Sequence, residues 1–132
     1  MKSPSDLKLL KVIYEEYYDE FTCFDKDNPN RQAKILIPID CKRIGKKLGV
    51  DSDIVFGRLY YHMEKEYGYK DERRNRVVFF ANSAGDEIHC INFPYMASVL
   101  GKLQHEDEKF KISTWLSIIA LIVSIVALCL SA

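Results

Sequence analysis

Few side chains in this sequence are spaced for catalysis or metal binding. His62 and Glu64 have the H-x-E spacing of sites in which a zinc ion activates water, but the P-C-x-x-C pair that completes such sites is missing. His89 and Cys90 are both potential metal ligands, yet neighbouring residues on a strand point to opposite faces. The sequence has no glycine-rich phosphate loop and no nucleophile elbow. We therefore expect no catalytic residue, no metal and no cofactor, and we do not expect an enzyme.

The charged side chains are distributed unevenly along the chain. The 132 residues include 19 Lys and Arg and 19 Asp and Glu. Residues 31–76 hold 12 basic and seven acidic side chains, an excess of five positive charges. Such an excess indicates an anionic partner, either nucleic acid or lipid headgroups, or it is simply a solvated surface.

Two helices joined by a tight glycine turn are predicted in this basic segment. Asp40 can cap a helix over residues 41–48, and Gly49 ends it because glycine readily adopts the left-handed conformation. A second helix is predicted over about residues 53–67. Gly45 falls where the two helices would cross and leaves no side chain between them. This is a helix-turn-helix pattern.

The flanking segments predict the remaining elements. Ser3 is expected to cap a first helix, and the stretch KILIPI is expected to form a short strand. The apolar runs Val77–Ala81 and Ile88–Phe93, joined by NSAGDE, predict a β-hairpin. A last helix is expected from Tyr95 onward.

In this order the elements resemble a winged helix-turn-helix domain, with the stretch IGKKLGVDSDIV as its signature. The resemblance covers roughly residues 5–105 and implies an α+β fold, with a β-hairpin wing and with the second helix presented to DNA. It implies that the groove-facing positions are Ser52, Asp53, Phe56, Gly57 and Tyr60. It also implies phosphate contacts from Lys42, Arg43, Lys46, Lys47, Arg58, Arg73, Arg74 and Arg76.

The sequence departs from a DNA-binding pattern in its charges and its aromatic residues. Asp51 and Asp53 put negative charge where phosphate would approach, and the tip of the wing carries Asp86 and no Lys or Arg. Large amphipathic residues such as Phe56 and Tyr60 are enriched at protein–protein contacts, although both could equally belong to the core.

The C-terminal residues 112–132 form an uncharged stretch of 21 residues, of which eleven are Ile, Leu or Val. As a helix it would be about 32 Å long, enough to cross the ~30 Å hydrocarbon layer of a membrane. Because all 19 Lys and Arg precede residue 112, we expect residues 1–105 to form a cytoplasmic domain and the C-terminus to lie across the membrane. Residues 106–111 would form a charged stalk.

Small residues recur along the predicted transmembrane helix with a period of 3.5 residues. Such stripes allow two helices to approach closely in lipid, so a homo-oligomer is a further prediction. The stripe comprises Ser113, Ser117, Ala120, Ser124, Ala127 and Ser131.

Two functions are consistent with these patterns. The first is a membrane-tethered regulator that binds duplex DNA through the helix-turn-helix. The alternative is a membrane-anchored adaptor or sensor whose winged helix binds a protein partner and not DNA. In both cases the lipid bilayer is a partner.

Overall fold

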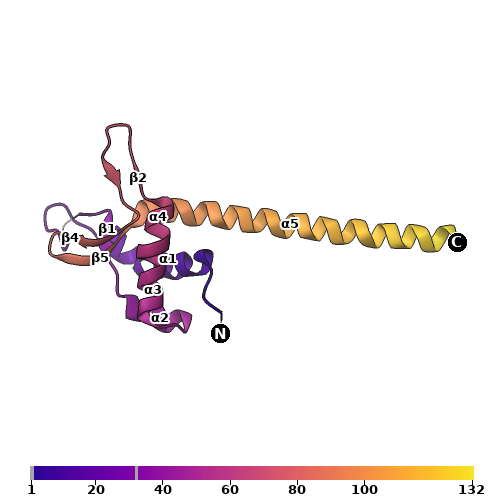
Figure 1. Ribbon diagram of the computed structural model, residues 1–132, viewed down its shortest axis with the longest axis horizontal. Helices are drawn as coiled ribbons and strands as arrows, with labels where there is room; N and C mark the ends of the chain where they lie inside the picture. Colours follow the sequence, from indigo (N-terminus) through magenta and orange to yellow (C-terminus); the bar gives the residue numbers. More distant parts are fainter. Residues whose placement is uncertain (1, 32) are drawn as a thin grey trace. The chain divides into compact units, whose positions relative to one another are not determined.

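The structure, a computed structural model, describes residues 2–31 and 33–132 and combines helices with β-sheet (Figure 1). The predicted α+β class and the long apolar C-terminal helix are both confirmed. The chain divides into two compact units, one up to Leu100 and one from Gly101 onward. The elements are α1 (Asp6–Thr22), β1 (Leu36–Pro38), α2 (Cys41–Leu48), α3 (Ser52–Gly57), the π-helix η1 (Arg58–Met63), α4 (Glu64–Tyr67), β2 (Tyr69–Lys70), β3 (Arg76–Val77), β4 (Phe80–Ala84), β5 (Glu87–Asn92) and α5 (Phe93–Ser131).

Helix α1 begins two residues later than predicted. The Ser5 hydroxyl accepts a hydrogen bond from the Lys8 N–H at 3.1 Å, so Ser5 and not Ser3 is the N-cap. Asp6 then occupies the first turn, where its negative charge is favourable. The buried face of α1 consists of Leu9, Leu10, Ile13 and Tyr17.

The predicted helix-turn-helix geometry is present in α2 and α3. The Asp40 carboxylate accepts from the Lys42 N–H at 3.0 Å, and Gly49 ends α2 in the left-handed conformation with φ 72°. Gly45 is buried at the crossing, where an added Cβ would lie only 2.6 Å from the Val50 carbonyl oxygen. The close approach of the two helices therefore requires glycine at this position.

The second predicted helix has a change of pitch in its middle. Helix α3 continues into η1 and then α4, which ends before Gly68 as expected. The π-helical segment was not predicted, and such segments often mark functional sites. Within it Leu59 is fully buried, while Tyr60 and Tyr61 keep 40% and 71% of their accessible surface.

The predicted hairpin is present, but its first strand starts later. Val77 pairs with Tyr69 in a separate two-stranded sheet, β2–β3, and β4 begins only at Phe80. The chain leaves β3 because the N–H groups of Phe79 and Phe80 both donate to the Glu64 carboxylate, at 2.6 and 2.8 Å. The main sheet has the order β1-β5-β4, with antiparallel pairing on both sides of β5.

Helix α5 starts at Phe93, two residues before the predicted position, and the Asn92 side chain accepts from the Tyr95 N–H at 3.3 Å. Its first two turns close the core of the N-terminal unit through Phe93, Met96, Val99 and Leu100. The other fully buried side chains of this core include Leu9, Leu10, Ile13, Ile37, Ile44, Leu59, Met63, Phe79, Phe80 and Ile91.

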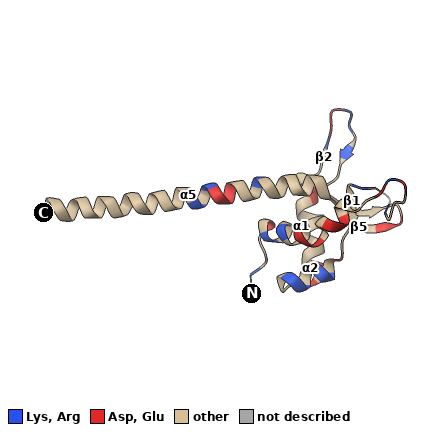
Figure 2. Ribbon diagram, turned by 180° about the vertical axis from the view of Figure 1, so that it is seen from behind, with Lys and Arg blue, Asp and Glu red and all other residues tan. Residues whose placement is uncertain are grey.

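Of the helices in the described part of the chain, α5 alone is long and apolar enough to cross a membrane, and its most apolar window is not buried at all. Every residue from 112 to 132 is exposed. Figure 2 shows that the C-terminal part of α5 carries no charged residue, whereas the part before it carries both signs.

Candidate functional site

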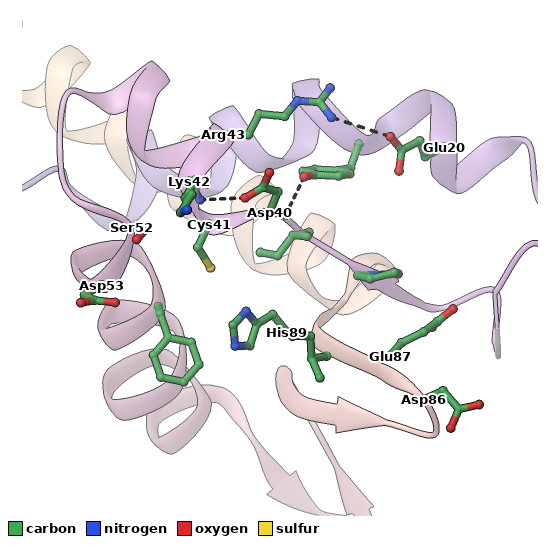
Figure 3. Close-up of a pocket in the computed structure, with 15 residues that line it drawn as sticks. Glu20, Asp40, Cys41, Lys42, Arg43, Ser52, Asp53, Asp86, Glu87 and His89 are labelled. Atoms are coloured by element: carbon green, nitrogen blue, oxygen red, sulfur yellow. Dashed lines mark hydrogen bonds and ion pairs between the residues drawn. The ribbon is translucent and has the colours of Figure 1, made fainter.

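A groove of about 900 Å³ lies between the start of α2 and α3 on one side and the β4–β5 hairpin on the other (Figure 3). It lies entirely within the N-terminal unit. Its lining brings together Tyr17, Glu20, Pro38, Ile39, Asp40, Cys41, Lys42, Arg43, Ser52, Asp53, Phe56, Asp86, Glu87, Ile88 and His89. The groove therefore unites positions from the predicted recognition helix with the tip of the predicted wing.

The α3 side of the groove presents the half-buried ring of Phe56. This ring stacks on Tyr60 with centroids 5.3 Å apart, and it lies 4.9 Å from the His89 ring and 5.9 Å from the Phe80 ring. Phe80 is buried, so Phe56 joins the core to the groove. The sequence did not distinguish whether Phe56 and Tyr60 belong to the core or to a contact surface. Phe56 is half-buried and contacts the core ring of Phe80, whereas Tyr60 is exposed, and a contact role for either residue stays a prediction.

Carboxylates outnumber cations in the lining of the groove. Acidic side chains come from α1, from the N-cap of α2, from the first turn of α3, from the hairpin turn and from the start of β5, as Glu20, Asp40, Asp53, Asp86 and Glu87. Lys42 and Arg43 are the basic lining residues, and Arg43 is directed to α1, where its Nε lies 2.8 Å from Glu16. Figure 3 shows Asp53 and Asp86 on opposite walls.

Two of these carboxylates affect the pKa of the Cys41 thiol, which also lines the groove. Burial, with a smaller contribution from the charges of Asp40 and Asp53, raises the pKa of the Cys41 thiol from its ordinary value near 9 to about 11. Burial also raises the pKa of Tyr17, whose hydroxyl accepts from the Asp40 N–H at 2.8 Å. Cys41 is thus a neutral thiol at physiological pH and is unsuited to act as a nucleophile.

Four of the predicted phosphate-binding cations are paired with carboxylates of the same chain. Arg43 and Lys47 both contact Glu16, and they lower the pKa of that carboxyl, Lys47 most strongly. Arg58 lies 2.7 Å from Asp6 and is largely buried. Arg76 lies 2.8 Å from Glu64. Charges neutralised in this way attract phosphate weakly.

The other predicted cations are exposed but are divided between two places. Lys42 and Lys46 lie on α2, which Figure 2 shows as a basic helix, and within the described residues neither has a carboxylate partner. Arg73 and Arg74 lie in the turn between β2 and β3, away from the groove lining. Arg74 adopts the left-handed conformation there, with φ 63°. Ser52 lines the groove at the start of α3.

Two polar residues organise this unit: Arg31, which the sequence did not single out, and Glu64, which it singled out only for its H-x-E spacing. The Arg31 guanidinium is buried and donates to the carbonyl groups of Glu20, Phe21, Ala33 and Lys34, which fixes the long loop after α1. Glu64 holds two backbone N–H groups and Arg76, as described above. Both residues act through contacts distant in sequence or through backbone groups, which the local pattern does not reveal.

One cluster on the surface of the N-terminal unit has side chains of metal-ligating type. The ligand atoms of Asp6, His62 and Glu66 all lie within 4.8 Å of one another. Asp6 already accepts from Arg58 at 2.7 Å, and His62 Nε2 lies 3.2 Å from Glu66. We interpret the cluster as an ion-pair network that ties the start of α1 to the π-helical segment.

The predicted packing stripe of α5 lies on the exposed C-terminal unit. Ser117 and Ser124 donate to the carbonyl groups of Ser113 and Ala120, at 3.0 and 2.9 Å, so these hydroxyls are satisfied within the helix. The Ser131 hydroxyl likewise donates to the Leu128 carbonyl group, and self-association through the stripe stays a prediction. Its members are Ser113, Ser117, Ala120, Ser124, Ala127 and Ser131.

Comparison with known proteins adds no relative from which a function could be transferred. No protein-family model matches the chain, and neither a curated protein nor a solved structure has significant similarity to it.

Proposed function

We propose that this chain is a single-pass membrane protein whose N-terminal unit is a winged-helix module that binds a protein partner in the groove. The winged-helix assignment is supported by the order α1, β1, α2, α3, β4, β5, α5 and by the glycine-tight turn between α2 and α3. The small β2–β3 hairpin is an addition to that order.

Membrane anchorage is supported by the exposure of α5. Eleven Ile, Leu and Val side chains in residues 112–132 would all face water in a soluble chain. In lipid they contribute roughly −3 to −6 kcal/mol toward insertion. Trp115 lies near the start of the stretch, where indole rings favour the membrane interface, and Lys111 precedes it. The excess of Lys and Arg before the stretch favours a cytoplasmic N-terminal unit.

The observation that carries the choice of partner is the charge of the groove. A DNA backbone brought against α3 and the hairpin would meet the carboxylates of the groove, and Arg43 is already paired with Glu16 and, at 4.0 Å, with Glu20. The electrostatic attraction that dominates most DNA binding is therefore reversed where a winged helix usually contacts DNA. A protein segment need not carry negative charge, so these carboxylates do not have to repel it. It also gains binding energy from contact with the aromatic surface of Phe56 and Tyr60.

A nucleic-acid function retains one favourable observation, the exposed pair Lys42 and Lys46 on α2. Duplex DNA titrated into the full-length chain in lipid nanodiscs separates the two functions. We expect no binding at about 50 mM salt, a condition that strengthens phosphate contacts. Binding that weakens steeply with salt and is lost in Lys42→Glu, Lys46→Glu would overturn the proposal in favour of the DNA-binding regulator. Lys8→Glu, Lys11→Glu serves as a charge-matched control on α1.

A further inference from the structure

The chemistry of the groove also defines what kind of protein segment fits it, and this inference rests on the proposed function. The groove has a negative part and an apolar part. The negative part extends from the N-cap of α2 and the first turn of α3 to the hairpin turn, and the apolar part includes the Phe56 ring and the Ile88 side chain. Ile88 keeps 61% of its accessible surface, an unusual exposure for an isoleucine in a central strand.

At its two edges the negative part has carboxylates that no Lys or Arg in the described part of the chain neutralises. Within the described residues, Asp53 and Asp86 are exposed and have no cationic partner, in contrast to Glu16, Glu64 and Asp6, each of which has one. Each wall therefore has a carboxylate that can form an ion pair with a cationic side chain of another protein. Burial is the main cause of the raised pKa of the Cys41 thiol at the start of α2, and the charges of Asp40 and Asp53 act in the same direction.

The apolar part lies next to the negative part, on α3 and on β5. Phe56 precedes Arg58 by two residues and follows Asp53 by one helical turn, so its ring and the Asp53 carboxylate lie on neighbouring positions of the same helix. On the hairpin, Ile88 follows Asp86 by two residues. Each wall thus carries an exposed carboxylate close in sequence to an apolar side chain.

We propose that the groove binds an extended segment of another protein in which a Lys or Arg side chain lies next to a large apolar one. The ammonium or guanidinium group would pair with Asp53 or with Asp86, which Figure 3 shows at opposite ends of the groove, and the apolar side chain would contact Phe56 or Ile88 beside it. An aromatic face beside a cation adds a further attraction. The groove volume of about 900 Å³ accommodates several side chains of such a segment.

The test uses the full-length chain in nanodiscs of zwitterionic lipid, so that the bilayer does not bind the cationic probe. Three fluorescent ten-residue peptides serve as probes: alternating arginine and leucine, alternating glutamate and leucine, and alternating arginine and serine. We expect the arginine–leucine peptide to bind, the glutamate–leucine peptide not to bind, and the arginine–serine peptide to bind at least about tenfold more weakly.

Variants locate the binding on the chain. Asp53→Asn, Asp86→Asn should weaken arginine–leucine binding at least about tenfold and reduce its dependence on salt. Ile88→Ser should weaken it while preserving the salt dependence. The control Glu15→Gln, Glu72→Gln removes the same charge from exposed positions outside the groove and should leave binding unchanged. The buried Cys90 thiol should stay unreactive in every variant if the unit is folded.

Two results would overturn this inference. If the glutamate–leucine peptide binds as well as the arginine–leucine peptide and Ile88→Ser weakens both, the cationic preference is wrong, but a protein-binding groove remains. If binding of the arginine–leucine peptide is unchanged in both groove variants, the groove does not bind the segment. Salt-sensitive DNA binding in the separate titration would instead contradict the proposed function itself.

Discussion

Replacing Glu64 by alanine should lower the free energy of unfolding of the N-terminal unit by about 2–4 kcal/mol. The Glu64 carboxylate accepts hydrogen bonds from the backbone N–H groups of Phe79 and Phe80, and it pairs with Arg76. Alanine leaves both N–H groups without this acceptor, next to two phenylalanine side chains that are almost completely buried. Because native domains are only marginally stable, this loss is a large fraction of the total free energy of unfolding.

Pulse proteolysis of the full-length chain across a urea series would measure this effect. Glu66→Ala is the matched control, since Glu66 lies in the same helix but pairs only with exposed His62. It should cost less than about 1 kcal/mol. Glu64→Gln should fall between the two, because its amide oxygen still accepts a hydrogen bond. Equal stability of Glu64→Ala and Glu66→Ala would show that Glu64 does not hold the start of β4.

Introducing Leu121→Arg and Ile125→Arg together should release the chain from membranes. Two arginines at the centre of a transmembrane helix cost about 5–7 kcal/mol on the insertion scale, more than the roughly −3 to −6 kcal/mol that the apolar residues contribute. Both side chains are exposed and belong to the C-terminal unit, so their replacement should leave the core of the N-terminal unit intact. Extraction of isolated membranes with alkaline carbonate measures the result.

The conservative pair Leu121→Val, Ile125→Leu is the control for this experiment. We expect the control and the unchanged chain to stay in the membrane pellet and the arginine variant to appear in the supernatant. An unchanged chain that carbonate extracts completely would contradict anchorage, and so would an arginine variant retained in the pellet as firmly as the control.

The parts of the fold that the sequence predicted well depend on local interactions. The cap at Asp40, the left-handed Gly49 and the glycine at the helix crossing each involve residues close in sequence, and each has few structural alternatives. The first cap was wrong because Ser3 and Ser5 are both suitable, and only the hydrogen bond to Lys8 distinguishes them.

The site was predicted only in part, because several of its charged residues form ion pairs with residues far away in the sequence. The sequence identified the acidic residues at the caps and at the wing tip, but it could not show that Glu16 on α1 would neutralise Arg43 and Lys47 on α2. It likewise treated the basic residues as one group, although Arg73 and Arg74 belong to a separate hairpin. Such pairs form only when distant elements pack together.

The late start of β4 also results from a contact between residues far apart in the sequence. Val77 to Ala81 is an apolar run suited to one strand, and nothing local indicates a break inside it. The break arises because Glu64, 15 residues before Phe79, binds the backbone there. Glu64 directly follows Met63, a buried residue of the same helical segment, and this position was a weak signal that its carboxylate has an internal partner.

The most direct test of a protein partner in the groove is photo-cross-linking from position 88 of the membrane-anchored chain in cells of its natural source. A photoreactive phenylalanine analogue in place of Ile88 should give an adduct that resists nuclease and is destroyed by protease. The adduct should disappear when Asp53→Asn, Asp86→Asn is added and persist with Glu15→Gln, Glu72→Gln. An adduct destroyed by nuclease, or one that the groove variants leave unchanged, would contradict the account.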